Sequence, residues 1–395
     1  MTVCSHCFRD KWSFKKNFPL RRYSVTISIT NNSPLHVGEV CYLTGNFNRW
    51  QTDGLLAGRI PPVGHSMTVV ADSVAEGMLE VKLTRGTWAT VACSVDGKLG
   101  DPYSLYIDKD MELLITIEAW RDDFPLSTAS AQVHILDEQF YFPKMDLRRR
   151  VWIYLPEGYA SNEQRYPVLY MHDGQHVFDE ATAVGRMGPI EWGVDEVIDE
   201  TVQKAIVVAV DHAPDFKGRE QEYLVNPVAE HHEVLGRAYL GDIVTVLKPY
   251  VDANYRTLSD RAHTAILGSS LAGLLNVYAG LEYPSVFGAV GIFSPSVWID
   301  RKGLYDWLYL VKQKMQHSET NQFFYLYCGA LEVRKQQGKV PVAMAEDMED
   351  LAKSLAEIKS LHIFKNINPQ GRHGALYWQR EFPEFYAWWQ EQINI

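Results

Sequence analysis

The chain has 395 residues, of which 46% are hydrophobic and 22% charged, a composition that fits a folded globular protein with room for two domains. Its formal charge of −11 argues against a general nucleic-acid binder, because neutralising phosphates requires an excess of Lys and Arg. No run of 18 apolar residues could span a membrane, and residues 1–18 lack the apolar core of a secretory leader. Together with few, scattered cysteines, this predicts a cytoplasmic protein without a membrane or nucleic-acid partner. Nothing in the sequence predicts an oligomeric state.

Residues 1–22 form a lead-in with clustered Lys and Arg. Cys4 and Cys7 have the spacing of half a zinc site, but the second pair of ligands is missing. The chain has five cysteines, an odd number, so we interpret this pair as free thiols.

Residues 23–122 consist of short segments in which apolar and polar residues alternate, separated by turns rich in Asn, Pro and Gly. Closely spaced strands without a helical period predict an antiparallel, immunoglobulin-like β-sandwich. The strands are expected at residues 23–29, 39–43, 67–70, 78–83 and 113–117.

This region resembles the family of starch- and glycogen-binding modules. The resemblance is carried by residues 41–50 (CYLTGNFNRW) and 79–88 (LEVKLTRGTW). It implies that Trp50 stacks on a sugar, and Trp88 is the other tryptophan of the matching segments. The family's second stacking tryptophan should fall near residues 92–93, where this chain has no aromatic residue. The alternative is that both tryptophans are packing residues of a structural domain.

A short charged connection at residues 121–127 leads into a different pattern over residues 128–395, where apolar strands alternate with amphipathic helices. Such alternation predicts a mostly parallel sheet covered on both faces. The strands are expected at residues 131–136, 150–155, 168–172, 205–210, 264–267, 289–293, 323–328 and 361–364. The helices are expected at residues 193–202, 234–251, 271–283, 303–316, 342–358 and 381–392.

Residues 264–274 contain a short apolar strand, a turn with a serine and an immediate helix start. This is the layout of a nucleophile elbow, which exposes a serine hydroxyl above the sheet. The motif G-x-S-x-A-G places Ser270 between glycines, with Ala272 where glycine is commoner. The helix start offers the Leu271 N–H to a developing negative charge. An elbow in mid-sheet makes the α/β-hydrolase fold the expected version of this α/β architecture.

A serine near neutral pH needs an imidazole to accept its proton and a carboxylate to orient that imidazole. In this fold the chain order is serine, acid, histidine. Glu332 directly follows a predicted buried strand, and His373 lies in a Gly-flanked loop after the last one. Asp347 and Asp350 compete for the role of the acid, but they fall on the polar face of a predicted helix.

The oxyanion needs a second N–H donor besides Leu271. The strand at residues 168–172 ends in a tight turn, Asp173-Gly174-Gln175, where α/β-hydrolases place this donor. The backbone N–H of Gly174 or of Gln175 fits this position, and the sequence does not choose between them.

Residues 151–389 resemble the family known as "Putative esterase", which includes esterase D, feruloyl and acetyl xylan esterases and enterochelin esterases. The resemblance implies Ser270 as nucleophile, Glu332 as acid and His373 as base. The chain departs from the usual pattern at Ala272 and in having a glutamate where many relatives have aspartate. The matching blocks are residues 166–175, 219–223, 247–257, 268–273 and 293–298.

Two tryptophans and several histidines of this region are further candidates for site residues. Trp192 and Trp298 lie near strand ends and either line an acyl or aromatic pocket or belong to the core. The remaining histidines of this region lack the helical spacing of a metal motif, so we expect no metal and no cofactor. These histidines are His172, His176, His212, His231 and His232.

The sequence therefore predicts a serine esterase that forms an acyl-enzyme with a small-molecule ester. The first domain favours a carbohydrate-linked acyl ester as substrate. The alternative substrate is a siderophore trilactone, which fits a chain without a leader because iron-loaded siderophores are opened inside cells. A non-enzymatic alternative is a glucan-binding protein with a degenerate hydrolase domain.

Overall fold

The computed structural model describes residues 21–185, 188–228, 233–315, 321–334 and 341–393. The chain divides into two compact units, Met1–Phe124 and Pro125–Ile395. Cys4, Cys7 and most of the lead-in lie outside the described residues. No helix within the described ranges is long and apolar enough to cross a membrane.

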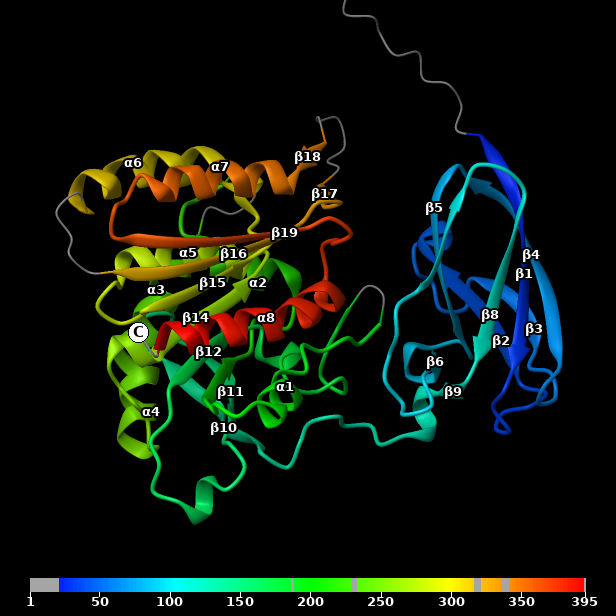
Figure 1. Cartoon of the computed structure of the whole chain (residues 1–395), viewed down its shortest axis with the longest axis horizontal. Coiled ribbons are helices and arrows are strands. Elements are labelled where there is room, and N and C mark those ends of the chain that lie inside the picture. Colours follow the sequence, from blue (N-terminus) through cyan, green and yellow to red (C-terminus); the bar gives the residue numbers. More distant parts are fainter. Residues whose placement is uncertain (1–20, 186–187, 229–232, 316–320, 335–340, 394–395) are drawn as a thin grey trace, which may run out of the picture. The chain divides into compact units, whose positions relative to one another are not determined.

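The first unit contains two sheets that share one core (Figure 1). A three-stranded sheet has the order β4-β1-β8, and a four-stranded sheet has the order β3-β2-β5-β7. A small pair, β6 and β9, completes the unit among its described residues. The strands are β1 (Arg22–Asn31), β2 (Val40–Gly45), β3 (Leu55–Arg59), β4 (Ser66–Ala75), β5 (Gly77–Thr84), β6 (Ala92–Cys93), β7 (Tyr103–Ile107), β8 (Met111–Ile117) and β9 (Ala119–Trp120).

The β-sandwich is mixed rather than purely antiparallel. Strand β1 pairs antiparallel with β4, but it pairs parallel with β8, with Val25 opposite Met111. Parallel neighbours cannot be joined by a hairpin, and the long stretch of chain between β1 and β8 supplies the connection they need. Alternation still sets the core: Val25, Ile27 and Ile29 of β1 are fully buried between the two sheets.

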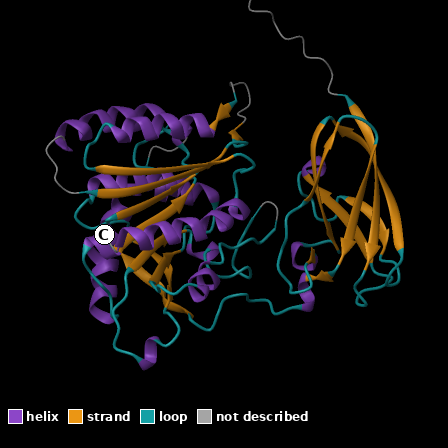
Figure 2. Cartoon of the chain, viewed as in Figure 1, coloured by secondary structure: helices purple, strands orange, loops and turns teal. Residues whose placement is uncertain are grey.

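The second unit is built on an eight-stranded sheet with helices on both faces (Figure 2). From β13 to β19 all neighbours are parallel, whereas β11 pairs antiparallel with β10 and β13. In spatial order the strands are β10 (Val133–Phe142), β11 (Leu147–Tyr154), β13 (Ile206–Val210), β12 (Val168–His172), β14 (Thr264–Ser269), β15 (Ala289–Phe293), β16 (Gln322–Gly329) and β19 (Leu361–Asn368). This order, with β13 and β12 exchanged, confirms the predicted α/β-hydrolase fold.

Successive side chains of each buried strand point to opposite faces of the sheet, so each strand contributes to two separate cores. In β12, Val168 and Tyr170 face one core, and Leu169 and Met171 face the other. Helices α2 to α7 cover the first face, and α1 and α8 cover the second. The helices are α1 (Val194–Glu200), α2 (Phe216–Tyr223), α3 (Gly236–Asp242), α4 (Lys248–Asn254), α5 (Leu271–Glu282), α6 (Arg301–Met315), α7 (Met344–Ala356) and α8 (Ala375–Ile393).

Two helices differ from the sequence expectation. Helix α2 was not predicted, because its sequence is mostly polar and has no apolar stripe. Helix α8 starts at Ala375, six residues before the expected position, and carries Pro383 inside it. A proline lacks the N–H that an internal helical position donates, so it was expected near the start of the helix instead.

Candidate active site

Ser270 lies in the sharp turn between β14 and α5, with φ 60° and ψ −115°. This backbone is unfavourable for a residue with a side chain, and it persists where the surroundings enforce it. The small neighbours allow it: a Cβ at Gly268 would lie 2.7 Å from His172 Cδ2, and one at Gly273 would lie 2.7 Å from Phe293 O. Ala272 is fully buried beside them. The turn has the backbone geometry expected of a nucleophile elbow, and an alanine fits where glycine is commoner.

His373 connects the serine to Glu332. Its Nε2 lies 3.1 Å from Ser270 Oγ, and its Nδ1 lies 2.7 Å from Glu332 Oε2. Glu332 follows β16 by three residues, and His373 lies in the turn between β19 and α8. The three side chains come from the carboxyl ends of parallel strands, which meet at one edge of the sheet.

The loops that carry the acid and the histidine are packed backbone to backbone. Gly329 approaches Gly371 so closely that a Cβ at Gly329 would lie 2.2 Å from the Gly371 carbonyl carbon. The Leu331 N–H donates to the Gly371 carbonyl at 3.1 Å. A glycine at 329 is therefore required for Glu332 to reach His373.

Each oxygen of the Glu332 carboxylate accepts a hydrogen bond, although the side chain is only 1% exposed. Oε1 accepts from Ser294 Oγ and from the Gly329 N–H, both at 2.7 Å, and Oε2 faces His373. Burial alone raises the pKa of Glu332, but the hydrogen bond and charge of His373, with help from Ser294 and Gly329, bring it below its ordinary value. Glu332 is ionised at neutral pH.

Burial lowers the pKa of His373, and Glu332 offsets only part of that effect. The imidazole is therefore neutral near pH 7, as a general base must be. The edge of its ring meets Trp378 at a centroid distance of 5.0 Å. Trp378 Nε1–H in turn donates to Ser294 Oγ at 3.0 Å, which links the orientation of the histidine to that of the acid.

The predicted oxyanion turn lies beside the elbow. Strand β12 pairs with β14 up to Met171 and Leu267, so the turns that follow the two strands are neighbours. Among the described residues, the backbone N–H groups of Gly174, Gln175 and Leu271 donate to no hydrogen-bond acceptor. All three are available to a ligand, and the choice between Gly174 and Gln175 stays open.

A buried ion pair holds this turn in place. Asp173 has a left-handed backbone, φ 57°, and its carboxylate accepts two hydrogen bonds from Arg219, at 2.6 and 2.7 Å. The Asp173 N–H donates to Tyr223 OH at 3.2 Å. Burial raises the pKa of Asp173, but the charge and hydrogen bonds of Arg219, with the nearby His212 and His176, bring the pKa well below its ordinary value. The pair therefore stays charged and fixes the residue directly before the predicted oxyanion donors.

His172, His176 and His212 make contacts with other residues of the catalytic unit. His172 bridges Tyr239 OH (2.9 Å) and Asn276 Oδ1 (2.7 Å) beneath the elbow. His176 and His212 stack on each other at 5.7 Å. Burial lowers the pKa of both His172 and His176 to about 4. His231 and His232 lie outside the described residues.

The four predicted tryptophans are mainly packing residues. Trp192 is 5% exposed and stacks between Phe293 and Trp378, so it supports the site from within the core. Trp298 is half-buried against the core of the other face. In the first unit Trp50 is 7% exposed, and its ring packs on that of the half-buried Trp88 with a centroid distance of 6.3 Å. The packing alternative accounts for this pair.

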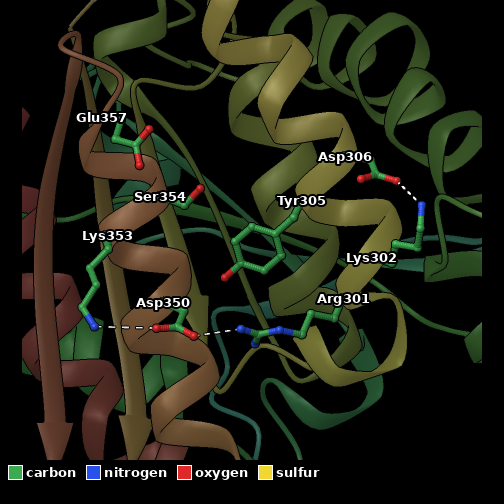
Figure 3. A pocket seen from close by; sticks show the side chains of 8 residues that line it. All are labelled: Arg301, Lys302, Tyr305, Asp306, Asp350, Lys353, Ser354 and Glu357. Atoms are coloured by element: carbon green, nitrogen blue, oxygen red, sulfur yellow. Dashed lines mark hydrogen bonds and ion pairs between the residues drawn. The ribbon is translucent and has the colours of Figure 1, made fainter. Parts of the chain in front are cut away.

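Asp347 and Asp350, the competing acids, lie on α7 and pair with Arg301 of α6. Asp350 also borders a cavity of about 760 Å³ between these two helices (Figure 3). Within the cavity Lys302 pairs with Asp306 and Lys353 with Asp350, and Glu357 pairs with Lys312 outside the lining. Neither aspartate is within the hydrogen-bonded set at Ser270, which leaves Glu332 as the acid partner of His373.

Several side chains that support the site were not predicted from the sequence. Ser294 has a left-handed backbone, φ 44°, and bonds Glu332, while Ser296 Oγ lies 3.1 Å from Ser270 Oγ. Both residues belong to the block 293–298, so the resemblance of this block to the family was the sequence feature that could have identified them. Nothing in the sequence pairs Arg219 with Asp173, or Trp378 with Ser294, because each pair joins distant segments.

A family model described as "Putative esterase" matches residues 143–389. The uncharacterized protein YbbA of Bacillus subtilis is 26% identical over 158 residues, which cover 38% of this chain and 58% of YbbA. An endo-1,4-β-xylanase/feruloyl esterase of Xylanibacter ruminicola is 29% identical over 150 residues, which cover 36% of this chain and 19% of that protein. The chain spans less than two thirds of the length of either relative.

Among solved structures, the enterobactin esterase FES from Shigella flexneri in the presence of enterobactin is similar in fold, with a TM-score of 0.53 and 16% sequence identity. The similarity covers 89% of this chain and 88% of that chain, so it extends through both units. The family model alone covers more than half of the chain. The chain therefore belongs to the "Putative esterase" family.

Proposed function

We propose that Ser270 is the nucleophile of this esterase, that His373 is its general base and acid, and that Glu332 orients the imidazole. The observation that carries the proposal is the continuous chain of hydrogen bonds from Glu332 through His373 to a serine in a strained turn. The non-enzymatic alternative has no support, since a degenerate domain would tend to lose one of these groups.

The reaction starts with the Ser270 hydroxyl donating to His373 Nε2 while Nδ1–H donates to Glu332. As Ser270 Oγ attacks the ester carbonyl, its proton moves to Nε2, and the ionised Glu332 stabilises the imidazolium. Ser296 OH is placed to donate to Ser270 Oγ and so helps to orient the hydroxyl.

The carbonyl oxygen becomes negative in the tetrahedral intermediate. The N–H of Leu271 and that of Gly174 or Gln175 are the proposed donors, and one such donor contributes about 3–4 kcal/mol to transition-state stabilisation. The intermediate collapses as His373 gives its proton to the leaving alcohol, which leaves an acyl-Ser270. A water, deprotonated by the same imidazole, then releases the acid and regenerates the serine.

For the substrate, we propose a siderophore ester of the trilactone class. The support is the fold similarity to a protein solved with enterobactin, which includes the first unit as well as the catalytic one. The carbohydrate-linked ester is the second candidate, supported by the feruloyl esterase relative, whose match covers only 36% of this chain. The buried ring of Trp50 weakens the sugar-binding argument that first favoured it.

Two measurements test these proposals in turn. Turnover of p-nitrophenyl acetate and butyrate by the wild type and Ser270→Ala tests the nucleophile, and full activity of the variant would exclude it. Values of kcat/KM for ferric enterobactin, feruloylated arabinose and acetylated xylo-oligosaccharide then separate the substrate classes. A preference for either sugar ester over enterobactin would overturn the siderophore proposal and leave the esterase mechanism intact.

A further inference from the structure

A second cluster of carboxylates lies outside the active site, at the start of α1. Single ligand oxygens of Glu191, Asp195 and Glu196 all lie within 4.8 Å of one another. Glu191 is 3% exposed and Asp195 fully buried. Buried charges of one sign normally have a partner of the other sign or a metal ion close by.

The hydrogen bonds of Glu191 and Asp195 leave one oxygen of each side chain unsatisfied among the described residues. Glu191 accepts from Thr128 OH through Oε1, and Asp195 accepts from the Ser130 N–H through Oδ2 at 2.8 Å. Glu191 Oε2 and Asp195 Oδ1 are buried and have no hydrogen-bond partner among the described residues. Unpaired buried carboxylate oxygens are costly and call for a bound cation or proton.

The charges around Glu191 also indicate a place for a cation. Its neighbours in the cluster, Asp195 and Glu196, are carboxyls too, so groups of one charge sign meet at this place. The other cluster with metal-ligand spacing, His36 with Asp122 and Asp123, is different, because Arg85 pairs with Asp122 and His36 bonds Asp123. No such cation is paired with Glu191 or Asp195 within the described part of the chain.

We propose that Glu191, Asp195 and Glu196 form a binding site for a hard divalent cation of the Ca²⁺ or Mg²⁺ class. Carboxylate oxygens are the ligands these ions prefer, and the set contains no thiol or imidazole. Oxygens bound to one Ca²⁺ at about 2.3–2.6 Å can be up to about 5 Å apart, which matches the spacing of the cluster.

The cation would join three segments of the catalytic unit. Thr128 and Ser130 belong to the chain before β10, Glu191 to the loop before α1, and Asp195 and Glu196 to the first turn of α1. Trp192, between the ligands, stacks on Trp378, which contacts His373. The site is thus structural. Two ring contacts, Trp192 with Trp378 and Trp378 with His373, connect it to the active site.

The test is a thermal melt of the full chain after chelation, with CaCl₂ or MgCl₂ added at constant ionic strength. A cation that binds only the folded state should raise the melting temperature of the wild type by about 5 °C. Glu191→Gln and Asp195→Asn should lose this rise, whereas Glu200→Gln, an exposed control on the same helix, should keep it. The comparison of Ca²⁺ with Mg²⁺ identifies the preferred ion.

A second measurement needs no variant. Tb³⁺ bound at the site should emit when tryptophan is excited, because Trp192 adjoins Glu191, and Ca²⁺ should displace it with one ion per chain. The proposal is overturned if neither ion shifts the melt and Tb³⁺ gives no displaceable signal. It is equally overturned if Glu191→Gln and Asp195→Asn keep the full shift, which would place the ion elsewhere or leave the cluster to a shared proton.

Discussion

Glu332 and Glu191 are two buried glutamates of the same unit with opposite electrostatics. They are 1% and 3% exposed, and burial by itself raises the pKa of both. Glu332 is surrounded by donors on both oxygens and ends below its ordinary pKa, whereas Glu191 faces other carboxyls and rises to about 9. Burial sets the cost of the charge, and the neighbours decide whether the charge survives.

The difference also separates two kinds of site. A carboxylate whose hydrogen bonds are complete can orient a base, because it has one stable position and one charge state. A carboxylate with an unsatisfied oxygen still has capacity to bind an ion or a proton. If the hydrogen bonds of Glu332 are complete for this reason, changes at the first site should affect catalysis more than changes at comparable buried groups elsewhere.

The largest effect on activity is expected for a substitution of Ser270, the end of the hydrogen-bond chain from Glu332 through His373. Ser270→Ala removes the nucleophile and should lower kcat for p-nitrophenyl butyrate by about 10⁴-fold or more. Ser296→Ala, the neighbouring hydroxyl, is the matched control and should lose less than about tenfold. Labelling by a fluorophosphonate should fail only in Ser270→Ala; labelling that persists there would place the nucleophile elsewhere.

Glu332→Gln keeps the size of the side chain but removes its charge. The imidazole then loses the partner that fixes its tautomer, and kcat should fall by about 10⁴-fold. Glu381→Gln is a suitable control, since Glu381 is 4% exposed and accepts from Tyr325 OH and Asn366 Nδ2 away from the serine. It should change kcat by less than about threefold. Equal losses in both variants would mean that burial, and not the histidine contact, explains the effect.

Asp173→Asn tests the ion pair behind the oxyanion turn. An uncharged partner leaves the guanidinium of Arg219 without its counter-charge, which loosens the turn and should lower kcat by about 10–100-fold with little change in KM. Arg237→Ala breaks a more exposed ion pair, Arg237 with Glu282, and should stay within about twofold of the wild type. A loss confined to KM would show that Asp173 acts on binding instead.

The smallest expected effect concerns the pH dependence of kcat/KM, and specifically the pH below which activity falls. His373 must be neutral to accept the serine proton, and its pKa is lowered by burial. The value of kcat/KM should therefore fall about tenfold per pH unit only below the ordinary imidazole value of about 6.5. An acid limb centred above that value would mean that Glu332 outweighs burial and raises the pKa of the histidine.

Local patterns were sufficient for most of the catalytic unit. The strands Val168–His172 and Ala289–Phe293 have the predicted bounds, because fully apolar runs between turn residues leave little choice. The polar helix α2 was missed, as were the short strands β3, β6, β7 and β9 of the first unit, since each has too weak a pattern to stand out. The parallel pairing of β1 with β8 depends on residues far apart in the chain.

The residue types, their order and their place after strands were enough to predict an α/β-hydrolase with Ser270, Glu332 and His373 as its reactive set. Those features are local, because strain in a turn and the end of a strand are properties of short segments. Tertiary structure alone decided how Ser294 and Trp378 complete the network and how Arg219 holds Asp173. It also decided that one oxygen of Glu191 has no hydrogen-bond partner among the described residues. Each depends on which distant side chains share a buried volume, and a linear pattern does not contain that information.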